Sequence, residues 1–447
     1  MKKSKLIKTV IGAGALLSAT PIVATSCNNN EDKVNESQNY IKFAGNKLVI
    51  DHALNQADLN AMQPQDYQFS DGVIHKAIFV DGIPYRISYI TEMQIGNCGD
   101  ETLTIPSNFL MGGTVTATST LEACTALQKL DLHGIKTTTI ENTPLVETDY
   151  WDLWCPNMLE IKVPTLVKTG DTLSIPDYFL SYDDPEYLAR PRTLQKVDLT
   201  GFKDVTHIGS EFLYYVKNLT DVNLTALTNV TSIGDDFLSV CISLEKVDLS
   251  SFSNVTSIGN FFLASAKITS IDLSPLSNLE EIQTNFLDGC TSLESIKFPS
   301  QCDATAIGTY FLRGCSELKS IDLSCFTNVK QIGTNFLYNC TSLTSVDMSK
   351  FTSLTTSVGN NFLYNCTSLT DVNMGTINPT IVGPSSSGNT CFEVKLTQDE
   401  YNNYDGIKLT GDSTVENDWD PATQAGGKFT PIAWSGSGSV NCRKWKA

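Results

Sequence analysis

Cysteine and histidine are the residue types in this 447-residue chain that could support covalent or metal chemistry. The chain has 13 cysteines and four histidines, which are His52, His75, His133 and His207. Protein zinc sites need clustered ligands, commonly paired Cys-x-x-Cys motifs joined by histidines. The histidines are scattered singly, away from the recurring cysteines described next. We therefore expect neither a metal site nor a cofactor.

Four cysteines recur at a nearly constant interval: Cys290, Cys315, Cys340 and Cys366. If the chain stacks at this period, they face the same way on neighbouring strands about 4.8 Å apart. Parallel Cβ vectors then lie near or beyond the upper limit of the ~3.5–4.5 Å Cβ separation that a disulfide needs. We expect free, buried thiols that act as small apolar residues. A bridge between Cys391 and Cys442, near the C-terminus, stays open as an alternative.

Catalytic patterns are absent from the sequence. Ser435-Gly-Ser-Gly-Ser439 lacks the flanking strand and helix of a nucleophile elbow, and there is no phosphate-binding loop. The paired carboxylates Asp183-Asp184 and Asp235-Asp236 fall in loops or at helix starts, where the helix dipole favours acids in any case. We expect that the protein is not an enzyme.

The elements that would position any functional group are short repeats along most of the chain. The pair Phe-Leu begins at Phe212, Phe237, Phe262, Phe286, Phe311, Phe336 and Phe362. A fixed period in the twenties is the signature of a solenoid, in which each unit covers the apolar side of its neighbour.

One unit runs from Ile307 to Leu323. Its first half places apolar residues at helical spacing: Ile307, Phe311, Cys315 and Leu318. This spacing predicts a short helix or helical turn. In the second half, Ile321 and Leu323 alternate about Asp322 as in a half-buried strand. We predict one helical turn and one strand per repeat, with the strands side by side in one parallel sheet.

The repeated pattern Ile-Gly-x-x-Phe-x-x-x-Cys-x-x-Leu-x-x-Ile-x-Leu resembles the BspA-type leucine-rich repeat. Weaker units open at Ile105 and Ile175, so the resemblance covers about residues 98–390. It implies an α/β repeat fold: a right-handed, curved leucine-rich-repeat solenoid with one parallel β-sheet, short helical turns and terminal caps. It also implies a bacterial surface protein of adhesion or host contact. Gln301 and Ala304 replace apolar residues of the pattern, so we expect local irregularity there.

Residues 1–26 have the order of an export signal. Lysines precede an apolar run over residues 10–17, and small residues lead to Ala24-Thr-Ser-Cys27. The run is shorter than the roughly 20 apolar residues that span a bilayer. The segment resembles the lipoprotein signal of mollicutes (Mycoplasma-type), which implies a lipid on Cys27 that anchors the protein on the outer face of the cell membrane. The alternative is an ordinary cleaved signal.

Residues 27–39 contain a single large apolar residue, Val34, and are predicted to form a solvated tether. Residues 40–97 lack the repeat but contain strand-like segments, Lys47–Ile50, Val73–Val80 and Tyr85–Ile90. We interpret them as an N-terminal cap that covers the open end of the array, and a small separate β-rich domain is the alternative.

The periodic pattern ends by residue 390, and we interpret residues 391–447 as a C-terminal cap. Trp419, Trp434 and Trp445 lie there, and we expect them to fill the core of the cap. An aromatic carbohydrate-binding face is the alternative. Within the array, Phe179 and Phe212 lie further apart in sequence than the later repeats do, and the segment Tyr182–Arg192 supplies the excess as a loop.

The formal charge of −18 excludes one class of partner. Removing residues 1–26 would remove four lysines and no acids, so the remaining chain is more acidic still. A body of this charge is not attracted to nucleic acid or to anionic lipid, and no basic stripe with interleaved aromatic residues is present.

The strand residue between the two inward positions should point to solvent, and in most repeats it is acidic: Asp198, Asp248, Asp272, Asp322 and Asp347. Two residues earlier lies a hydroxyl column: Ser270, Ser295, Ser320 and Ser345. Solenoids use such faces for partners. We predict a binding or adhesion module, expected to be monomeric, that takes a polar or cationic partner such as a host matrix protein or a cell-surface glycan. The alternative is a solvated face on a passive surface coat or antigen.

Overall fold

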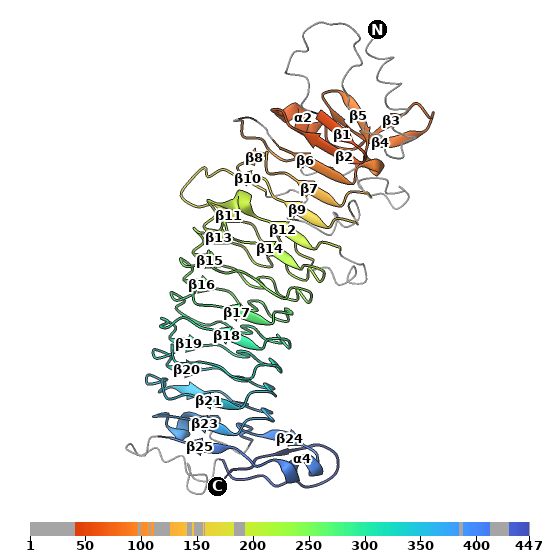
Figure 1. Ribbon diagram of the computed structural model, residues 1–447. Helices are drawn as coiled ribbons and strands as arrows, with labels where there is room; N and C mark the ends of the chain where they lie inside the picture. The colour runs from red at the N-terminus through yellow and green to blue at the C-terminus, as the bar shows by residue number, and fades with distance from the viewer. Residues whose placement is uncertain are drawn as a thin grey trace. The chain divides into compact units, whose positions relative to one another are not determined.

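The computed structural model describes residues 41–96, 99, 101–106, 109–110, 126–140, 145–146, 155, 157–182, 193–383, 388–411 and 429–446 (Figure 1). The chain divides into two compact units, the first comprising Met1–Val205 and Asp221–Leu227 and the second Thr206–Thr220 and Thr228–Ala447. The predicted signal, Cys27, the tether, Trp419 and nearly all of the loop Tyr182–Arg192 lie outside the described residues.

The first unit is built on a seven-stranded sheet of order β1-β2-β6-β7-β9-β12-β14. The strands are β1 (Ile41–Ala44), β2 (Lys47–Ile50), β6 (Glu92–Ile95), β7 (Lys129–Asp131), β9 (Glu160–Lys162), β12 (Lys196–Asp198) and β14 (Asp221–Asn223). β1 and β2 form an antiparallel hairpin, and every later pairing is parallel. The central residue of each three-residue strand is buried, so one face of the sheet covers the core and the other carries the flanking polar residues.

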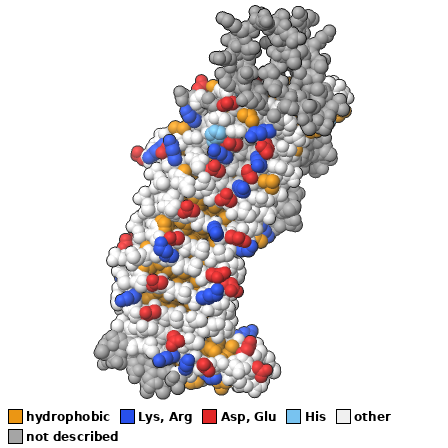
Figure 2. Space-filling view, in the orientation of Figure 1, with side chains coloured by type: hydrophobic (Ala, Val, Ile, Leu, Met, Phe, Trp, Pro, Cys, Tyr) orange, Lys and Arg blue, Asp and Glu red, His pale blue; other side chains and the backbone are white. Residues whose placement is uncertain are grey.

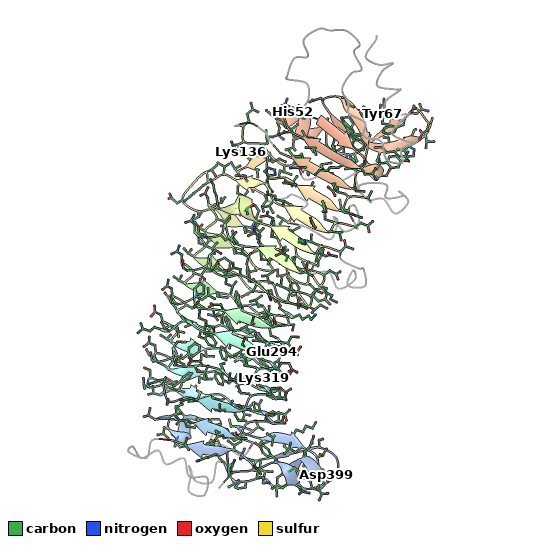
Figure 3. All side chains as sticks on the ribbon, viewed as in Figure 1. His52, Tyr67, Lys136, Glu294, Lys319 and Asp399 are labelled. Carbon is green, nitrogen blue, oxygen red and sulfur yellow. The ribbon has the colours of Figure 1, made fainter. Side chains whose placement is uncertain are left out.

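Smaller elements complete the first unit. Helix α2 (Gln56–Asn60) begins with a capping box between Asn55 and Asp58. The antiparallel sheet β3 (Gln65–Gln68), β4 (Ile74–Val80) and β5 (Ile83–Arg86) holds Tyr67, labelled in Figure 3, edge-on to Phe69 and Phe79. β8 (Lys136–Thr137) pairs with β10 (Thr165–Leu166), and η3 spans Thr200–Phe202. The prediction of one strand over Tyr85–Ile90 is wrong, because β5 ends at Arg86 and the 3-10 turn η2 (Ile87–Tyr89) follows.

The second unit is a stack of rungs, each formed by one repeat (Figure 1). One column of strands holds β17 (Ser270–Asp272), β18 (Ser295–Lys297), β21 (Ser345–Asp347), β23 (Asp371–Asn373) and β25 (Lys408–Thr410). Another column holds β13 (His207–Ile208), β15 (Ser232–Ile233), β16 (Ser257–Ile258), β19 (Ala306–Ile307), β20 (Gln331–Ile332) and β22 (Ser357–Val358). Each pairing between rungs is parallel, which confirms the predicted repeat solenoid and adds a second column of short strands that we did not predict.

The helical turn predicted around Phe311 is wrong. This segment is a run of turns in which Tyr310, Leu312 and Gly314 have φ values of 64°, 52° and 74°. Left-handed residues alternate with ordinary ones, and the N–H groups of the left-handed residues point in turn to the following and the preceding rung. The amide of Leu312 donates to Phe286 in the preceding rung (3.0 Å), and the amide of Gly314 donates to Tyr338 in the following rung (2.7 Å). Bonding between rungs therefore replaces bonding within a helix.

Two columns of side chains fill the core of the second unit. The phenylalanines of the Phe-Leu pairs stack nearly parallel, with ring centroids 5.2 Å apart between Phe311 and Phe336 and 5.3 Å between Phe336 and Phe362. The repeated cysteines are buried with free thiols, and each donates to a backbone carbonyl of the preceding rung. The Sγ of Cys315 lies 3.3 Å from the Leu287 oxygen, and that of Cys340 lies 3.2 Å from the Leu312 oxygen.

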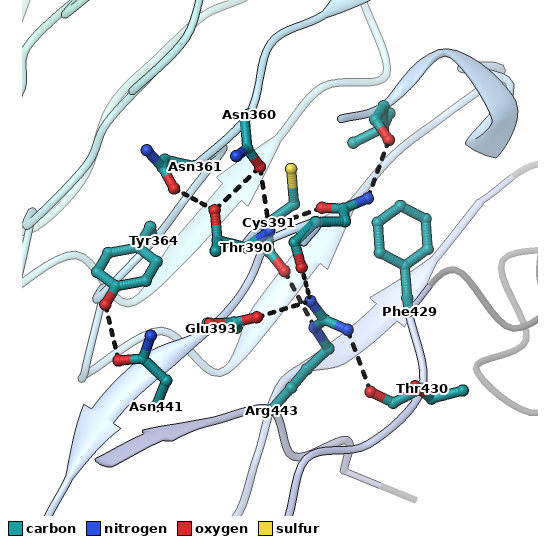
Figure 4. A network of polar contacts seen from close by, with 12 residues as sticks. Asn360, Asn361, Tyr364, Thr390, Cys391, Glu393, Phe429, Thr430, Asn441 and Arg443 are labelled. Atoms are coloured by element: carbon teal, nitrogen blue, oxygen red, sulfur yellow. Dashed lines mark hydrogen bonds and ion pairs between the residues drawn. The ribbon is translucent and has the colours of Figure 1, made fainter. Parts of the chain in front are cut away.

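The last residues of the second unit form a compact cluster. β24 (Val394–Leu396) pairs with β26 (Val440–Cys442), α4 (Gln398–Asn403) follows β24, and η4 (Pro379–Ile381) precedes them. Arg443, only 2% exposed, lies at its centre and donates to the carbonyls of Cys391, Asn389 and Thr430 and to the carboxylate of Glu393 (Figure 4).

Two of the three C-terminal tryptophans pack within this cluster. Trp445 lies edge-on to Phe392, with ring centroids 5.7 Å apart, and its Nε1 donates to the Phe429 carbonyl (2.9 Å). Trp434 packs against the apolar group formed by Val394, Leu396 and Cys442. Both rings therefore fill apolar volume, as the core interpretation predicts.

Candidate functional site

The hydroxyl column and the acidic column lie on the outer side of the rungs in the second unit. Ser270 and Asp272 are the exposed ends of β17, and Ser345 and Asp347 are the exposed ends of β21. Asp248, Ser320 and Asp322 occupy the same positions in rungs without an assigned strand and are also exposed. The pairing of β17 with β18 places Ser270 beside Ser295 and Asp272 beside Lys297 on neighbouring rungs. Asp198 belongs to β12 in the first unit.

Each aspartate in the acidic column also closes a turn. Its Oδ1 accepts a hydrogen bond from the backbone N–H two residues later, at 2.8–2.9 Å. This Asx turn ends the strand and directs the chain inward. Asn223 and Asn373 make the same bond with their amide oxygens, at 3.2 and 3.1 Å. The position therefore favours a short side-chain acceptor and tolerates the loss of charge, and in β18 it is occupied by Lys297.

Three carboxylates of the acidic column are stabilised in the ionised form. The hydrogen bond from Lys297, 2.8 Å from Oδ2 of Asp272, lowers the pKa of Asp272 to about 2. Hydrogen bonds from the backbone of Ser250 and from the side chain of Ser324 lower the pKa values of Asp248 and Asp322. These groups remain charged at neutral pH.

Further charge pairs bridge the rungs beside the columns. Lys319 and Glu294, labelled in Figure 3, lie 3.2 Å apart on consecutive rungs, and Lys267 and Glu245 lie 2.8 Å apart. All four side chains are at least half exposed, so solvent screens each pair and its contribution to stability is small. The face of the second unit is thus a rigid frame of hydroxyls, carboxylates and a few paired lysines.

The first unit carries a second candidate site, a hollow of about 430 Å³ on the outer face of its seven-stranded sheet. Its polar lining residues are Lys47, Glu92, Gln94, Lys129, Asp131, Glu160, Lys162, Lys196, Asp198, Asp221 and Asn223. Figure 2 shows positive and negative side chains interspersed over this part of the described surface. We call this hollow the charged groove.

The first residues of the strands in the charged groove alternate in sign. In register, the column reads Lys47, Glu92, Lys129, Glu160, Lys196 and Asp221. Lys129 contacts carboxylates on both sides, Glu92 at 4.0 Å and Glu160 at 3.5 Å. The alternation cancels the net charge while keeping many donors and acceptors at the surface.

Sequence reasoning missed most of the charged groove. Of the residues in the charged groove, the predicted site includes only Asp198. The residues before it are missing from the prediction because their repeats are too degenerate to align by the Phe-Leu period. The usable signal was the short motif charged-apolar-charged, as in Glu160-Ile-Lys162 and Lys196-Val-Asp198. In these two segments the motif coincides with the half-buried strands β9 and β12.

Two further features are missing from the described residues. Within them, no group of three or more histidine, cysteine, aspartate or glutamate side chains is arranged to hold a metal ion. Among the same residues, no helix has the length and apolar character needed to cross a bilayer.

The family model described as the BspA type leucine-rich repeat region matches six copies, over residues 206–340 and 256–393. No curated relative matches the chain in sequence. Among solved structures, a leucine-rich repeat protein from Bacteroides ovatus is 20% identical and aligns 58% of this chain with 72% of that one, at a TM-score of 0.33.

Two other solved structures are similar at lower identity. A leucine-rich cell surface protein from Faecalibacterium prausnitzii is 14% identical, with coverage of 79% and 97% and a TM-score of 0.24. The pneumococcal vaccine antigen PcpA is 12% identical, with coverage of 84% and 93% and a TM-score of 0.23.

Proposed function

We propose that this chain, whose residues 206–393 match the family model of the BspA-type leucine-rich repeat, is a surface-exposed binding module that takes a polar partner on the sheet face of its second unit. The observation that carries the proposal is the pair of in-register exposed columns: Ser270, Ser295, Ser320 and Ser345, and Asp248, Asp272, Asp322 and Asp347. Rungs spaced about 4.8 Å apart hold these groups in a fixed array, so a partner can engage several of them without ordering them first.

The serine column supports a binding role more directly than the acidic column. The aspartates are needed for their Asx turns, so the fold alone accounts for an acceptor at that position. The serine hydroxyls lie on the exposed ends of their strands, and a strand position of this kind accepts many residue types. A repeated serine there is consistent with selection for hydrogen bonding to a partner.

The partner that fits this face is a host matrix protein or a cell-surface glycan, since both present dense hydroxyl and amide groups. A first experiment immobilises each class of ligand and measures binding of the full chain. Saturable binding to one of them supports a module. Absence of binding across host extracts supports the second reading, a surface coat without a dedicated ligand.

The decisive variant converts Asp248, Asp272, Asp322 and Asp347 to asparagine. Asn223 and Asn373 already close the same turn, so the fold should persist while four charges leave the face. We expect weaker binding with a smaller salt dependence.

The matched control removes four charges away from both columns, by Glu280→Gln, Glu281→Gln, Asp303→Asn and Glu317→Gln. A companion variant replaces the four serines with alanine.

If the asparagine and alanine variants both bind like wild type, the face of the second unit is not the binding surface. The charged groove is then the next surface to test, and Lys129→Ala is the sharpest change there because Lys129 contacts two acids.

Export and lipid attachment at Cys27 are a separate part of the proposal and rest on the sequence. A lipid on this cysteine would place the module on the outer face of the membrane, beyond the tether of residues 27–39. The Cys27→Ser protein, expressed in the source cell, should leave the detergent phase. Unchanged partitioning of this variant would contradict the lipid anchor and leave the binding face untouched.

A further inference from the structure

Three neighbouring strands of the charged groove, β7, β9 and β12, carry outward residues of opposite sign on either side of a buried apolar residue (Figure 1). The order of the signs reverses from each strand to the next, because β7 pairs with β9 and β9 with β12 in register. We call the six charged residues of these strands the checkerboard: Lys129 and Asp131, Glu160 and Lys162, and Lys196 and Asp198.

Attraction between paired residues explains only part of this pattern. It favours alternation along each side of the strands, but it does not fix the order of one side relative to the other. The opposite order of the two sides is therefore a feature that a partner can read.

The ion pairs of the checkerboard are long. The ammonium of Lys129 lies 3.5 Å from the Glu160 carboxylate, and that of Lys196 lies 3.8 Å from it. A hydrogen-bonded ammonium and carboxylate are typically about 2.7–2.9 Å apart. Lys297 and Asp272 of the second unit reach that distance, at 2.8 Å. The three groove side chains are also more than a third exposed, so they keep hydrogen-bonding capacity for a partner.

The shape of the charged groove limits what can occupy it. The hollow measures about 430 Å³, and its lining includes the buried strand centres Leu130, Ile161 and Val197. A flat sheet from a second molecule would leave the hollow unfilled, whereas a convex rod would enter it. The convex rod that polypeptide chains form, with side chains at regular intervals, is the α-helix.

An α-helix that crosses the strands matches their spacing. Strands lie about 4.8 Å apart and helical turns rise about 5.4 Å, so three turns follow three strands to within about 1 Å. The flexible stem of lysine absorbs a difference of this size. Each turn of the helix also presents one residue on either flank of its contact face, as each strand presents one residue on either side of its centre.

We propose that the charged groove is a docking surface for an α-helix of a partner protein, laid across β7, β9 and β12. Acidic and basic residues alternate along each flank of this helix, with opposite signs on the two flanks of one turn. Every charge of the helix then meets an opposite charge of the checkerboard. A shift by one strand brings like charges together, so the groove selects the register of the helix. The groove belongs to the first unit, so this partner is additional to the one proposed for the second unit.

The test measures binding of the full chain to two synthetic peptides of identical composition, each about 20 residues long so that a helix forms in isolation. The alternating peptide exchanges acid and base between its flanks at each turn. The uniform peptide keeps all acids on one flank and all lysines on the other. We expect the alternating peptide to bind about tenfold more tightly at low salt, with a smaller ratio at high salt. Equal affinities, or no binding of either peptide, would overturn the proposal.

A charge swap locates the binding site. Lys129→Glu combined with Glu160→Lys keeps the net charge but reverses two members of the checkerboard. This variant should lose its preference for the alternating peptide, and a peptide whose two facing residues are exchanged should restore it. The matched control swaps an exposed pair of the second unit, Lys267→Glu with Glu245→Lys, and should behave like wild type.

Lys196→Gln is a milder change that does not depend on the folding of the swapped protein. It should reduce the preference for the alternating peptide, because one of the matched charges is gone. An unchanged preference in Lys196→Gln, or a swapped protein that folds but is not rescued by the exchanged peptide, would contradict docking in the charged groove.

Sedimentation of the full chain tests the competing occupant, a second copy of the same chain. We expect no association at the concentrations used for peptide binding. A concentration-dependent dimer that dissociates in the charge-swap variant would assign the charged groove to self-association and overturn the proposal.

Discussion

At the scale of single residues, one side chain often has both a structural and a surface role. The acidic column shows this most clearly, because each aspartate accepts a backbone N–H while its charge faces solvent. From the sequence we could predict that these residues are exposed, since strand alternation requires it. The sequence did not reveal that the Asx turn accounts for the repeated aspartate. In a sequence, an acceptor two residues before a chain reversal looks the same as a binding residue.

Asp272 provides a pH-dependent test of its pairing with Lys297. Its pKa of about 2 lies below the ordinary value of about 3.9, so its contribution to stability is present above about pH 4 and is lost as the pH falls through 2. The side chain is 55% exposed, so solvent screening limits that contribution to at most about 1 kcal/mol. Urea unfolding should show Asp272→Asn slightly destabilised at pH 7 and equal to wild type near pH 2. A difference that grows toward low pH would contradict this assignment.

Arg443 should be much more sensitive. Arg443→Met leaves three carbonyls and the buried Glu393 carboxylate without their donor, and breaking a buried pair from one side costs about 3–5 kcal/mol. Denaturant unfolding of the C-terminal rungs, followed by hydrogen exchange, measures the loss. Adding Glu393→Gln should recover part of it, because the unpaired charge is then absent. Equal stability of Arg443→Met and wild type would show that the network does not hold the cluster.

At the scale of elements, the sequence predicted the strands of the rungs and misjudged the segment between them. Spacing of three and four residues usually indicates a helix, yet here Phe311 and Cys315 face the core from a run of turns, and Ile307 faces it from the short strand β19. The helical interpretation failed because it counts apolar positions and ignores where backbone N–H groups find acceptors. In an array, the neighbouring rungs supply those acceptors, and alternation of left-handed residues directs the N–H groups toward them.

Close contact between rungs explains why a glycine follows the isoleucine in most repeats. A Cβ placed on Gly333 would lie 2.6 Å from the backbone carbon of Gly308, well inside van der Waals contact. Gly333→Ala should therefore push two rungs apart and cost about 1–3 kcal/mol, measured by denaturant unfolding. Gly170→Ala is the control, because no atom lies within 4 Å of a Cβ at Gly170. A similar cost at both positions would rule out close approach as the reason.

At the scale of the whole chain, the sequence predicted a repeat solenoid because the period is visible in seven consecutive units. It did not predict the charged groove, whose strands come from segments without a readable period. The predicted binding columns exist as exposed arrays, whereas their partner depends on chemistry that a repeated serine does not specify. The spacing of the repeated residues was thus enough to predict the fold, but it did not identify the ligand.

The recurring cysteines Cys290, Cys315, Cys340 and Cys366 form a column with Cys241, which has the same position in an earlier repeat, and this cysteine column should be unreactive in the folded chain. Burial raises the pKa values of Cys241, Cys290 and Cys366 to about 12, so almost no thiolate is present at pH 8. Native labelling with iodoacetamide should leave these residues unmodified for as long as the rungs stay closed, and labelling in denaturant should modify all three. Rapid native labelling at any of them would contradict the burial of the column.

The bonding of each rung to its neighbours has a mechanical consequence. Tension applied along the stack loads the bonds of one rung boundary at a time, so the array should yield by successive detachment of rungs. Each detached rung of about 25 residues releases roughly 80–90 Å of extended chain. A single-molecule pulling trace of residues 228–383 within the full chain should show a series of steps of this size. Under the proposed binding role, the array would lengthen when tension is applied to the bound partner and shorten again when the tension falls.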